Sequence, residues 1–460
     1  MTATALSRYW CEHAWLGGGT VADAVTVEVT DGRITAVTAN TDRRDAGTHL
    51  PGLVLPGLAN AHSHAFHRAL RSRTQRDRGT FWTWRDLMYR AADRLTPDSY
   101  YQLARGVYAE MVLAGITTVG EFHYLHHDHC GTHYDDPNAT GHALIAAARD
   151  AGLRVALLDT CYLSSAVDGS PLADGPQQRF GDRTGVQWAE RVETLHRHYA
   201  GDTDVVVGAA LHSVRGVPVE HMGAVVDWAA SHDAPLHVHS SEQTREIDQC
   251  LAVHGCTPTA LLRDHGALGP RTTAVHATHL TDADISDLDT TVTGVCFCPT
   301  TERDLGDGIG PASALMQAAG LFSLGSDSHA VVDLFEEARA VELDERLARR
   351  ERGLFAAADL LTAATANGHR ALGFHDAGHL RVGQRADLIA VDLESVRTAG
   401  GPPTAETAVF AAAAVDVTDV VVDGRVVVAD RRHTVIEHPA RELAHTITAL
   451  LDGEPVRSTP

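Results

Sequence analysis

Eight apolar, strand-like runs alternate with helix-like segments through the middle of this 460-residue chain, and this alternation limits the possible folds more than any other feature. The runs are residues 53–64, 117–124, 154–162, 204–214, 235–241, 273–280, 293–300 and 321–328. Segments with mixed charge and helical periodicity separate them, for example 138–151, 185–200, 218–231 and 333–352. Eight βα units of this size predict an α/β fold, a (β/α)8 TIM-like barrel with parallel, buried strands.

An open, doubly wound sheet is the alternative architecture for the same alternation of strands and helices. In its dinucleotide-binding form, that fold carries a GxGxxG motif directly after the first strand. No such motif follows the run at 53–64. The barrel is therefore the first prediction.

The two ends of the chain carry similar strand patterns. Alternating apolar and polar residues surround Asp31-Gly32 near the start and Asp423-Gly424 near the end, and both dipeptides are typical of tight hairpin turns. We expect one composite β-sandwich domain built from both ends. The predicted organisation is residues 1–55 and 376–460 for that domain, with a terminal helix and tail, and 56–375 for the barrel.

Composition excludes several function classes. All 38 basic residues are Arg, so Schiff-base chemistry, a P-loop lysine and a carbamylated lysine bridging two metals are impossible. The net charge of −22 disfavours binding to nucleic acid or to anionic membranes. Seven scattered cysteines, with no signal-like start and no long apolar run, indicate a cytoplasmic protein.

Metal-ligand residue types gather where the predicted strands end, which is the end of a barrel that carries the active site. His62 and His64 are two residues apart on the first strand, so both side chains lie on one face and can hold one ion. Further candidates follow later strands: His237, His239, Glu242, His276 and Asp327. Three imidazoles and a carboxylate suit one divalent metal, Zn²⁺ first and Fe²⁺ or Mn²⁺ as alternatives, which activates water to hydroxide at neutral pH.

The strings LPGLANAHSH, HVHSSE, VHATHL and GSDSH, followed by GHLRVGQRADLIAVDL, resemble the amidohydrolase superfamily over essentially the whole chain. Within it, AHSHAFHRALR, TFWTWRDLMYR, EFHYLHHD, LHSVR and LGDGI are similar to the formimidoylglutamate deiminase family. The resemblance implies a homodimer with one metal per subunit, held by His62, His64, His239 and Asp327. It also implies that Glu242, His276 and Asp327 act in catalysis, with Asp327 accepting the water proton and Glu242 passing protons to the departing ammonia.

The resemblance further implies hydrolysis of N-formimino-L-glutamate to N-formyl-L-glutamate and ammonia, a step of histidine degradation. The substrate is a small dicarboxylate, and a chain this acidic attracts it only through local Arg side chains. The matching substrate-binding positions are Arg85, Tyr124, His212, Arg215 and His67. The family pattern has Gln where this chain has His67, and a protonated imidazole there would favour a carboxylate.

Three other interpretations stay open. The same site in a related enzyme would deaminate a guanidino acid or an amino-heterocycle. A barrel that has lost catalysis and serves as a scaffold is disfavoured because the complete candidate site is present. The histidine-rich stretch 123–133 is a candidate for a second metal site. Its spacing suits no standard tetrahedral pattern, so loop structure is the first prediction for it.

Overall fold

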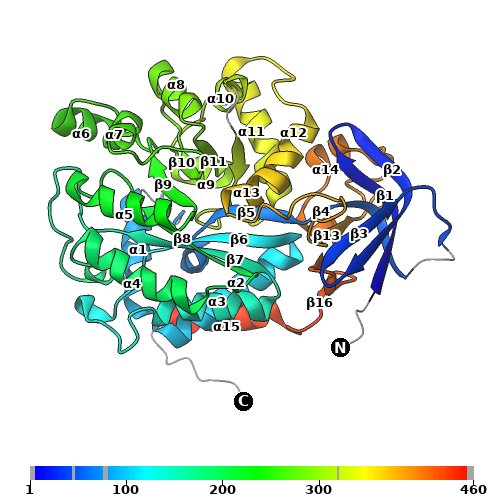
Figure 1. The fold of residues 1–460 in the computed structure, drawn as a ribbon, viewed down its shortest axis with the longest axis horizontal. Coiled ribbons are helices and arrows are strands. Elements are labelled where there is room, and N and C mark those ends of the chain that lie inside the picture. The colour runs from blue at the N-terminus through cyan, green and yellow to red at the C-terminus, as the bar shows by residue number, and fades with distance from the viewer. Residues whose placement is uncertain (1–5, 44–46, 76–80, 319–320, 453–460) are drawn as a thin grey trace.

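The computed structural model describes residues 6–43, 47–75, 81–318 and 321–452. Its larger part is a barrel of eight parallel strands in the order β5 to β12, with every strand beside its sequence neighbour (Figure 1). The strands are β5 (Leu58–Ser63), β6 (Ile116–His123), β7 (Arg154–Cys161), β8 (Val205–Leu211), β9 (Leu236–Ser240), β10 (Thr272–His276), β11 (Gly294–Phe297) and β12 (Phe322–Leu324). Each of the eight predicted runs overlaps one of these strands, so the predicted fold class is confirmed.

The barrel closes between its first and last strands. The amide of Asp327, just after β12, donates to His62 O (3.0 Å), and the amide of His64 donates to Asp327 O (3.2 Å). A parallel bridge joins Ser63 to Asp327 at the same point. The closure therefore places the histidines of the first strand beside the aspartate of the last.

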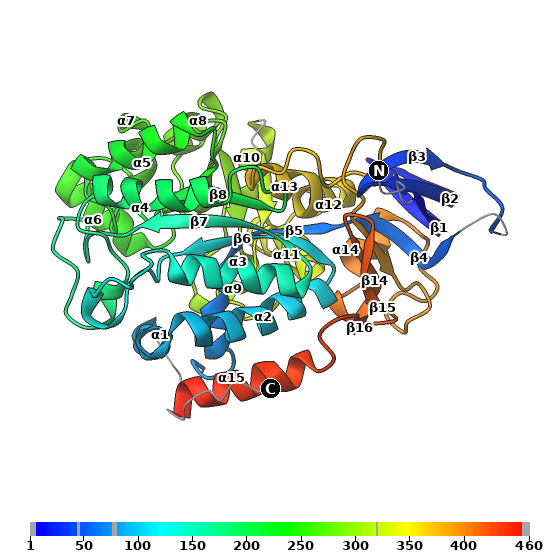
Figure 2. The same cartoon turned by 60° about the horizontal axis from the view of Figure 1, so that its bottom comes forward.

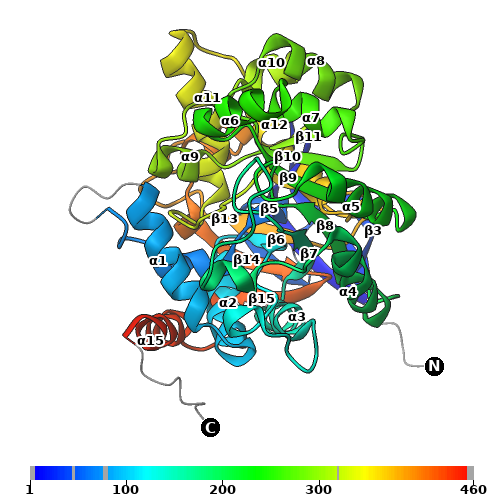
Figure 3. The same ribbon diagram turned by 90° about the vertical axis from the view of Figure 1, so that its left-hand side faces the viewer.

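Helices cover the outside of the barrel, as the view towards one end of the barrel shows (Figure 3). They are α1 (Phe81–Arg94), α2 (Pro97–Leu113), α3 (Ala139–Ala151), α4 (Gly185–His198), α5 (Val219–Ser231), α6 (Thr244–His254), α7 (Pro258–Asp264), α8 (Asp282–Thr290), α9 (Pro299–Leu305), α10 (Ala312–Gln317), α11 (Leu334–Arg349), α12 (Ala357–Thr362) and α13 (Gly368–Ala371). Thr281 caps α8 in a reciprocal capping box with Asp284. Within the described residues, every helix is too short or too polar to cross a bilayer.

A second sheet joins the two ends of the chain beside the barrel. Its order is β16-β15-β14-β13-β4-β1-β2-β3, and the two ends meet where β4 pairs antiparallel with β13. Its strands are β1 (Leu6–Gly17), β2 (Thr20–Thr30), β3 (Arg33–Thr38), β4 (Thr48–Pro56), β13 (Leu388–Val391), β14 (Val417–Val422), β15 (Arg425–Ala429) and β16 (Arg432–His433). The Asp31-Gly32 and Asp423-Gly424 turns form with positive φ, and an added Cβ on Gly32 would lie 3.2 Å from Asp423 O.

The run at 53–64, predicted as one strand, is two strands in two sheets. Pro56 ends β4 in the composite sheet, and Leu58 begins β5 of the barrel. A Cβ on the intervening Gly57 would lie 2.3 Å from Thr117 Oγ1, so only glycine lets the chain pass from one sheet to the other here.

The chain returns to the barrel in α15 (Pro439–Asp452), which lies along α2 (Figure 2). Gly106 on α2 allows this close approach, because an added Cβ there would lie 3.1 Å from Leu443 Cβ. The predicted tail beyond α15, residues 453–460, lies outside the described residues.

Candidate active site

The predicted metal ligands converge at the carboxyl end of the barrel. One ligand atom from each of His62, His64 and His239 lies within 4.8 Å of the other two. His62 Nε2 and His239 Nε2 are 3.1 Å apart, and Asp327 Oδ1 lies 3.5 Å from His62 Nε2 and 3.4 Å from His64 Nε2. These donors are all buried. They form a compact group around a single centre, which is the arrangement that one divalent ion requires.

Backbone carbonyls orient two of these imidazoles. His64 Nδ1 donates to Phe122 O (2.9 Å), and His239 Nδ1 donates to His212 O (2.8 Å). A proton on Nδ1 leaves Nε2 with a free lone pair, which is the ligand form of histidine. Burial holds the pKa of both rings, and that of His62, well below the usual range, so the rings are neutral. The donor set therefore fits a metal ion.

A buried polar network lies beneath the donors and joins β5, β6 and the segment after β12. Asn60 and Ser326 exchange two hydrogen bonds, Asn60 Nδ2 to Ser326 Oγ (2.7 Å) and Ser326 N to Asn60 Oδ1 (2.9 Å). Ser63 Oγ donates to Glu121 Oε2 (2.8 Å) and lies 3.1 Å from His329 Nε2. Movement of either strand end would leave buried polar groups unpaired, so the network fixes the donors.

His276 and Glu242 lie beside the donors, as their strand-end positions predict. His276 Nε2 is 4.0 Å from Glu242 Oε1 and 3.8 Å from Asp327 Oδ2. Burial lowers the pKa of His276, but the neighbouring carboxylates Glu242 and Glu302 outweigh it and raise the pKa well above the usual value. His276 and Asp327 both have positive φ (69° and 43°), a strained backbone for non-glycine residues that is concentrated at functional sites.

The five predicted substrate-binding residues line one cavity of about 420 Å³ together with Glu242, His276 and Asp327. These five are Arg85, Tyr124, His212, Arg215 and His67. Arg85 lies on α1, in the long connection after the first barrel strand, and its guanidinium is 5.5 Å from the Tyr89 ring centroid. His212 stacks on Tyr162, with ring centroids 3.8 Å apart.

His67 is buried and bonded to another member of the cavity wall. Its Nε2 lies 2.9 Å from Tyr124 Oη. Burial lowers the pKa of His67 to about 4, so the ring is neutral at neutral pH. A neutral His67 does not attract a carboxylate by charge, and it acts as a hydrogen-bonding group, as Gln does.

Two buried glutamates at this site were not predicted from the sequence. Glu302 on α9 lies 3.3 Å from His276 Nδ1. Glu246 on α6 lines the cavity with its carboxylate 3.9 Å from Arg215 Nη1, and burial raises its pKa to about 7. Glu246 lies just after HVHSSE and Glu302 just before LGDGI, so only the position of each glutamate after a barrel strand was available as a signal.

The first half of the histidine-rich stretch, up to His127, is buried in the barrel wall, whereas His129 and His133 are exposed. His123 ends β6, and His126, His127 and Asp159 are buried beside it. One atom each of His123, His126 and Asp159 lie within 4.8 Å of one another, but Arg191 already donates to both oxygens of Asp159 (2.8 and 2.9 Å). A guanidinium in this position neutralises the carboxylate and repels a cation. The cluster carries an ion pair in place of a second metal.

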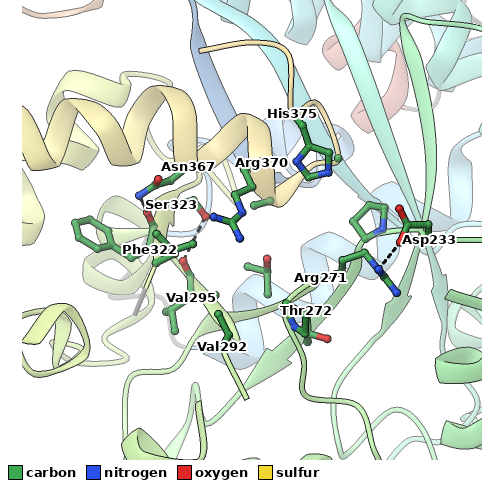
Figure 4. A pocket seen from close by; sticks show the side chains of 17 residues that line it. Asp233, Arg271, Thr272, Val292, Val295, Phe322, Ser323, Asn367, Arg370 and His375 are labelled. Atoms are coloured by element: carbon green, nitrogen blue, oxygen red, sulfur yellow. Dashed lines mark hydrogen bonds and ion pairs between the residues drawn. The ribbon is translucent and has the colours of Figure 1, made fainter. Parts of the chain in front are cut away.

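A second hollow opens at the opposite, amino end of β9 to β12 (Figure 4). Its polar groups are engaged locally: Arg271 pairs with Asp233, Asn367 Nδ2 donates to Phe322 O (3.0 Å), and Ser323 Oγ donates to Val295 O (3.3 Å). The lining residues include none of the predicted site residues. The carboxyl-end cavity is therefore the candidate active site.

The fold and the donor group define a class, a (β/α)8 barrel with a candidate centre of three histidines and one aspartate for a divalent metal. The profile of the amidohydrolase family matches residues 53–427, and the chain belongs to this family. It is a hydrolase that acts on C–N bonds.

Three known proteins illustrate the similarity. Formimidoylglutamate deiminase of Pseudomonas aeruginosa is 36% identical over 97% of this chain and 100% of that protein. An 8-oxoguanine deaminase of the same species is 30% identical over 77% of each. The crystal structure of an amidohydrolase from Brucella melitensis superposes with a TM-score of 0.89 at 31% identity, covering 97% of this chain and 100% of that one.

Proposed function

We propose that this protein hydrolyses N-formimino-L-glutamate to N-formyl-L-glutamate and ammonia, a step of histidine degradation. The observation that carries the proposal is the pair of arginines, Arg85 and Arg215, in one cavity with the candidate metal donors. Two guanidinium groups match the two carboxylates of a formimino dicarboxylate and have no counterpart on a neutral heterocycle. The relationship to formimidoylglutamate deiminase over the full chain supports the same choice.

The ion that we propose for the site is zinc, held by His62, His64, His239 and Asp327. The neutral imidazoles and the single carboxylate suit Zn²⁺, and the same donors also accept Fe²⁺ or Mn²⁺. When bound, a divalent ion there supplies Lewis-acid chemistry that makes water a better nucleophile at neutral pH.

The protein's own groups then orient the substrate and move protons. Arg85 and Arg215 bind the carboxylates, while Tyr124 and His212 complete the polar wall of the cavity. Attack of water on the formimino carbon forms a C–O bond, and the C–N bond to the terminal nitrogen breaks. Glu242 lines the cavity and is placed to carry protons to that nitrogen, so that it leaves as ammonia. His276, between Glu242 and Asp327, stabilises the negative charge on the new oxygen.

Ammonia release from N-formimino-L-glutamate by the zinc-loaded protein tests the proposal. The corresponding guanidino acid and an amino-heterocycle such as 8-oxoguanine are assayed in parallel. We expect strong preference for the formimino compound and loss of activity on chelation. Release from the heterocycle alone, with bound metal confirmed, would contradict the proposal and favour the related deaminase.

His67→Gln should keep kcat/KM within about threefold, because the amide can replace the imidazole as hydrogen-bonding partner of Tyr124. His67→Ala should lower kcat/KM about 10-fold, because it leaves the buried Tyr124 hydroxyl unpaired. Steady-state ammonia release measures both effects. Metal content is measured alongside, and its loss in His67→Gln would show that His67 is a metal ligand.

A further inference from the structure

His276 is surrounded by three carboxylates, of which only two face the reacting atoms. Glu242 Oε1 and Asp327 Oδ2 lie 4.0 and 3.8 Å from Nε2. The third, Glu302 Oε1, lies 3.3 Å from Nδ1 on the other edge of the ring. In the described part of the chain, Glu302 is not among the residues that line the cavity, so it acts on the reaction only through His276.

The hydrogen bonds of Glu302 show which atom carries the proton in its contact with His276. Glu302 Oε1 also accepts the amide of Cys298 (2.8 Å), which anchors the carboxylate to the start of α9. Because this oxygen is an acceptor in both contacts, the proton of the His276 contact lies on Nδ1. The ring is thereby held with Nε2 towards Glu242 and Asp327.

This orientation needs support from outside the cavity. The backbone of His276 has φ of +69° and that of Ala277 has φ of +48°, so the end of β10 is strained and does not fix the ring by ordinary strand geometry. In catalytic triads, a buried carboxylate on the far nitrogen of a histidine keeps the ring in its working tautomer. Glu302, with a side chain only 5% exposed, is such a carboxylate.

We propose that Glu302 is a positioning residue that accepts a hydrogen bond from Nδ1 of His276 and so holds the ring with Nε2 directed at Glu242 and Asp327. The proposal rests on the proposed role of His276 in the hydrolysis. It assigns a function to the strand-end segment CFCPTTE, which otherwise contributes only core residues.

The test compares Glu302 with a matched control, Glu337 on α11, which also bonds the start of α9. Glu337 is also a buried glutamate, and it accepts the Thr300 amide (2.9 Å) and hydroxyl (2.5 Å) at the start of α9. Loss of either carboxylate therefore removes support from α9, but only Glu302 bonds His276. Glu302→Ala removes both bonds of Oε1, whereas Glu302→Gln keeps an acceptor oxygen for both.

We expect Glu302→Ala to lower kcat about 100-fold with KM changed by less than about threefold. The kcat of Glu302→Gln should be about 10-fold higher than that of Glu302→Ala. Glu337→Ala should destabilise the protein but keep kcat within about threefold. Equal kcat in Glu302→Ala and Glu337→Ala, at equal metal content, would overturn the proposal.

A second readout does not depend on the substrate. A proton on Nδ1 shared with a carboxylate gives a ¹H NMR signal far downfield of the amides, and His276→Asn assigns it by its disappearance. We expect this signal in the metal-free wild type and in Glu337→Ala, and its loss in Glu302→Ala. Persistence of the signal in Glu302→Ala would refute the positioning role. Lack of wild-type activity on N-formimino-L-glutamate would count only against the proposed function, because the NMR test needs no substrate.

Discussion

Glu242→Gln is expected to lower kcat for N-formimino-L-glutamate about 1,000-fold, within the range that removal of a general acid–base group produces. The glutamine has nearly the same shape, so KM should change little. It cannot carry a proton to the departing nitrogen, although its side chain still lines the cavity beside His276. Steady-state ammonia release at saturating substrate measures the effect.

The control for this variant lies just after Glu242 in the chain, on α6. Asp248→Asn removes a carboxylate from an exposed position of α6 that is outside the cavity lining, and it should leave kcat unchanged. Metal content should match the wild type in both variants, because Glu242 belongs to none of the candidate donor groups in the described residues. Near-wild-type turnover of Glu242→Gln would remove Glu242 from the mechanism.

The barrel was predictable because its strands are buried on both faces, and strands of this kind have mostly apolar sequences. The boundary between the two sheets was not. LVLP and LANAHS follow each other as one strand-like run in the sequence, yet Pro56 pairs with Leu388 in one sheet and Leu58 with Ile116 in the other. The Pro56-Gly57 dipeptide is a local signal for a break, but the change of sheet at this point depends on the close approach of Gly57 to Thr117.

The meeting of the metal donors was predictable for a related reason. In a barrel the carboxyl ends of all strands lie at one end, so His62, His239 and Asp327 had to be neighbours once the strands were recognised. The placement of Arg85 on α1 came from family resemblance alone. The neutral state of His67 and the contact of Glu302 with His276 depend on burial and on distances between segments, which the sequence does not express.

Arg154→Met is expected to lower the free energy of unfolding by about 3–5 kcal/mol, the usual cost of leaving buried charges without their partner. Arg154 begins β7 of the barrel and is buried. It pairs with Asp387, next to β13, and its Nη1 lies 2.9 Å from Asp423 Oδ2 in the second hairpin turn. The variant leaves the buried Asp387 without its guanidinium where the composite sheet meets the amino end of the barrel, while Asp423 keeps Arg385 (Nη1 to Oδ1, 3.0 Å).

Arg8→Met is the matched control, because it breaks an exposed pair, Arg8 Nε to Glu28 Oε1 at 2.8 Å, within the same composite sheet. Exposed pairs contribute less than about 1 kcal/mol, so this variant should unfold almost as the wild type does. Urea unfolding at pH 7 compares the midpoints, and kcat of the folded Arg154→Met protein should be retained because the reacting groups lie at the other end of the barrel. Equal midpoints for the two variants would mean that Asp387 finds another partner or water, and that Arg154 does not hold the composite sheet to the barrel.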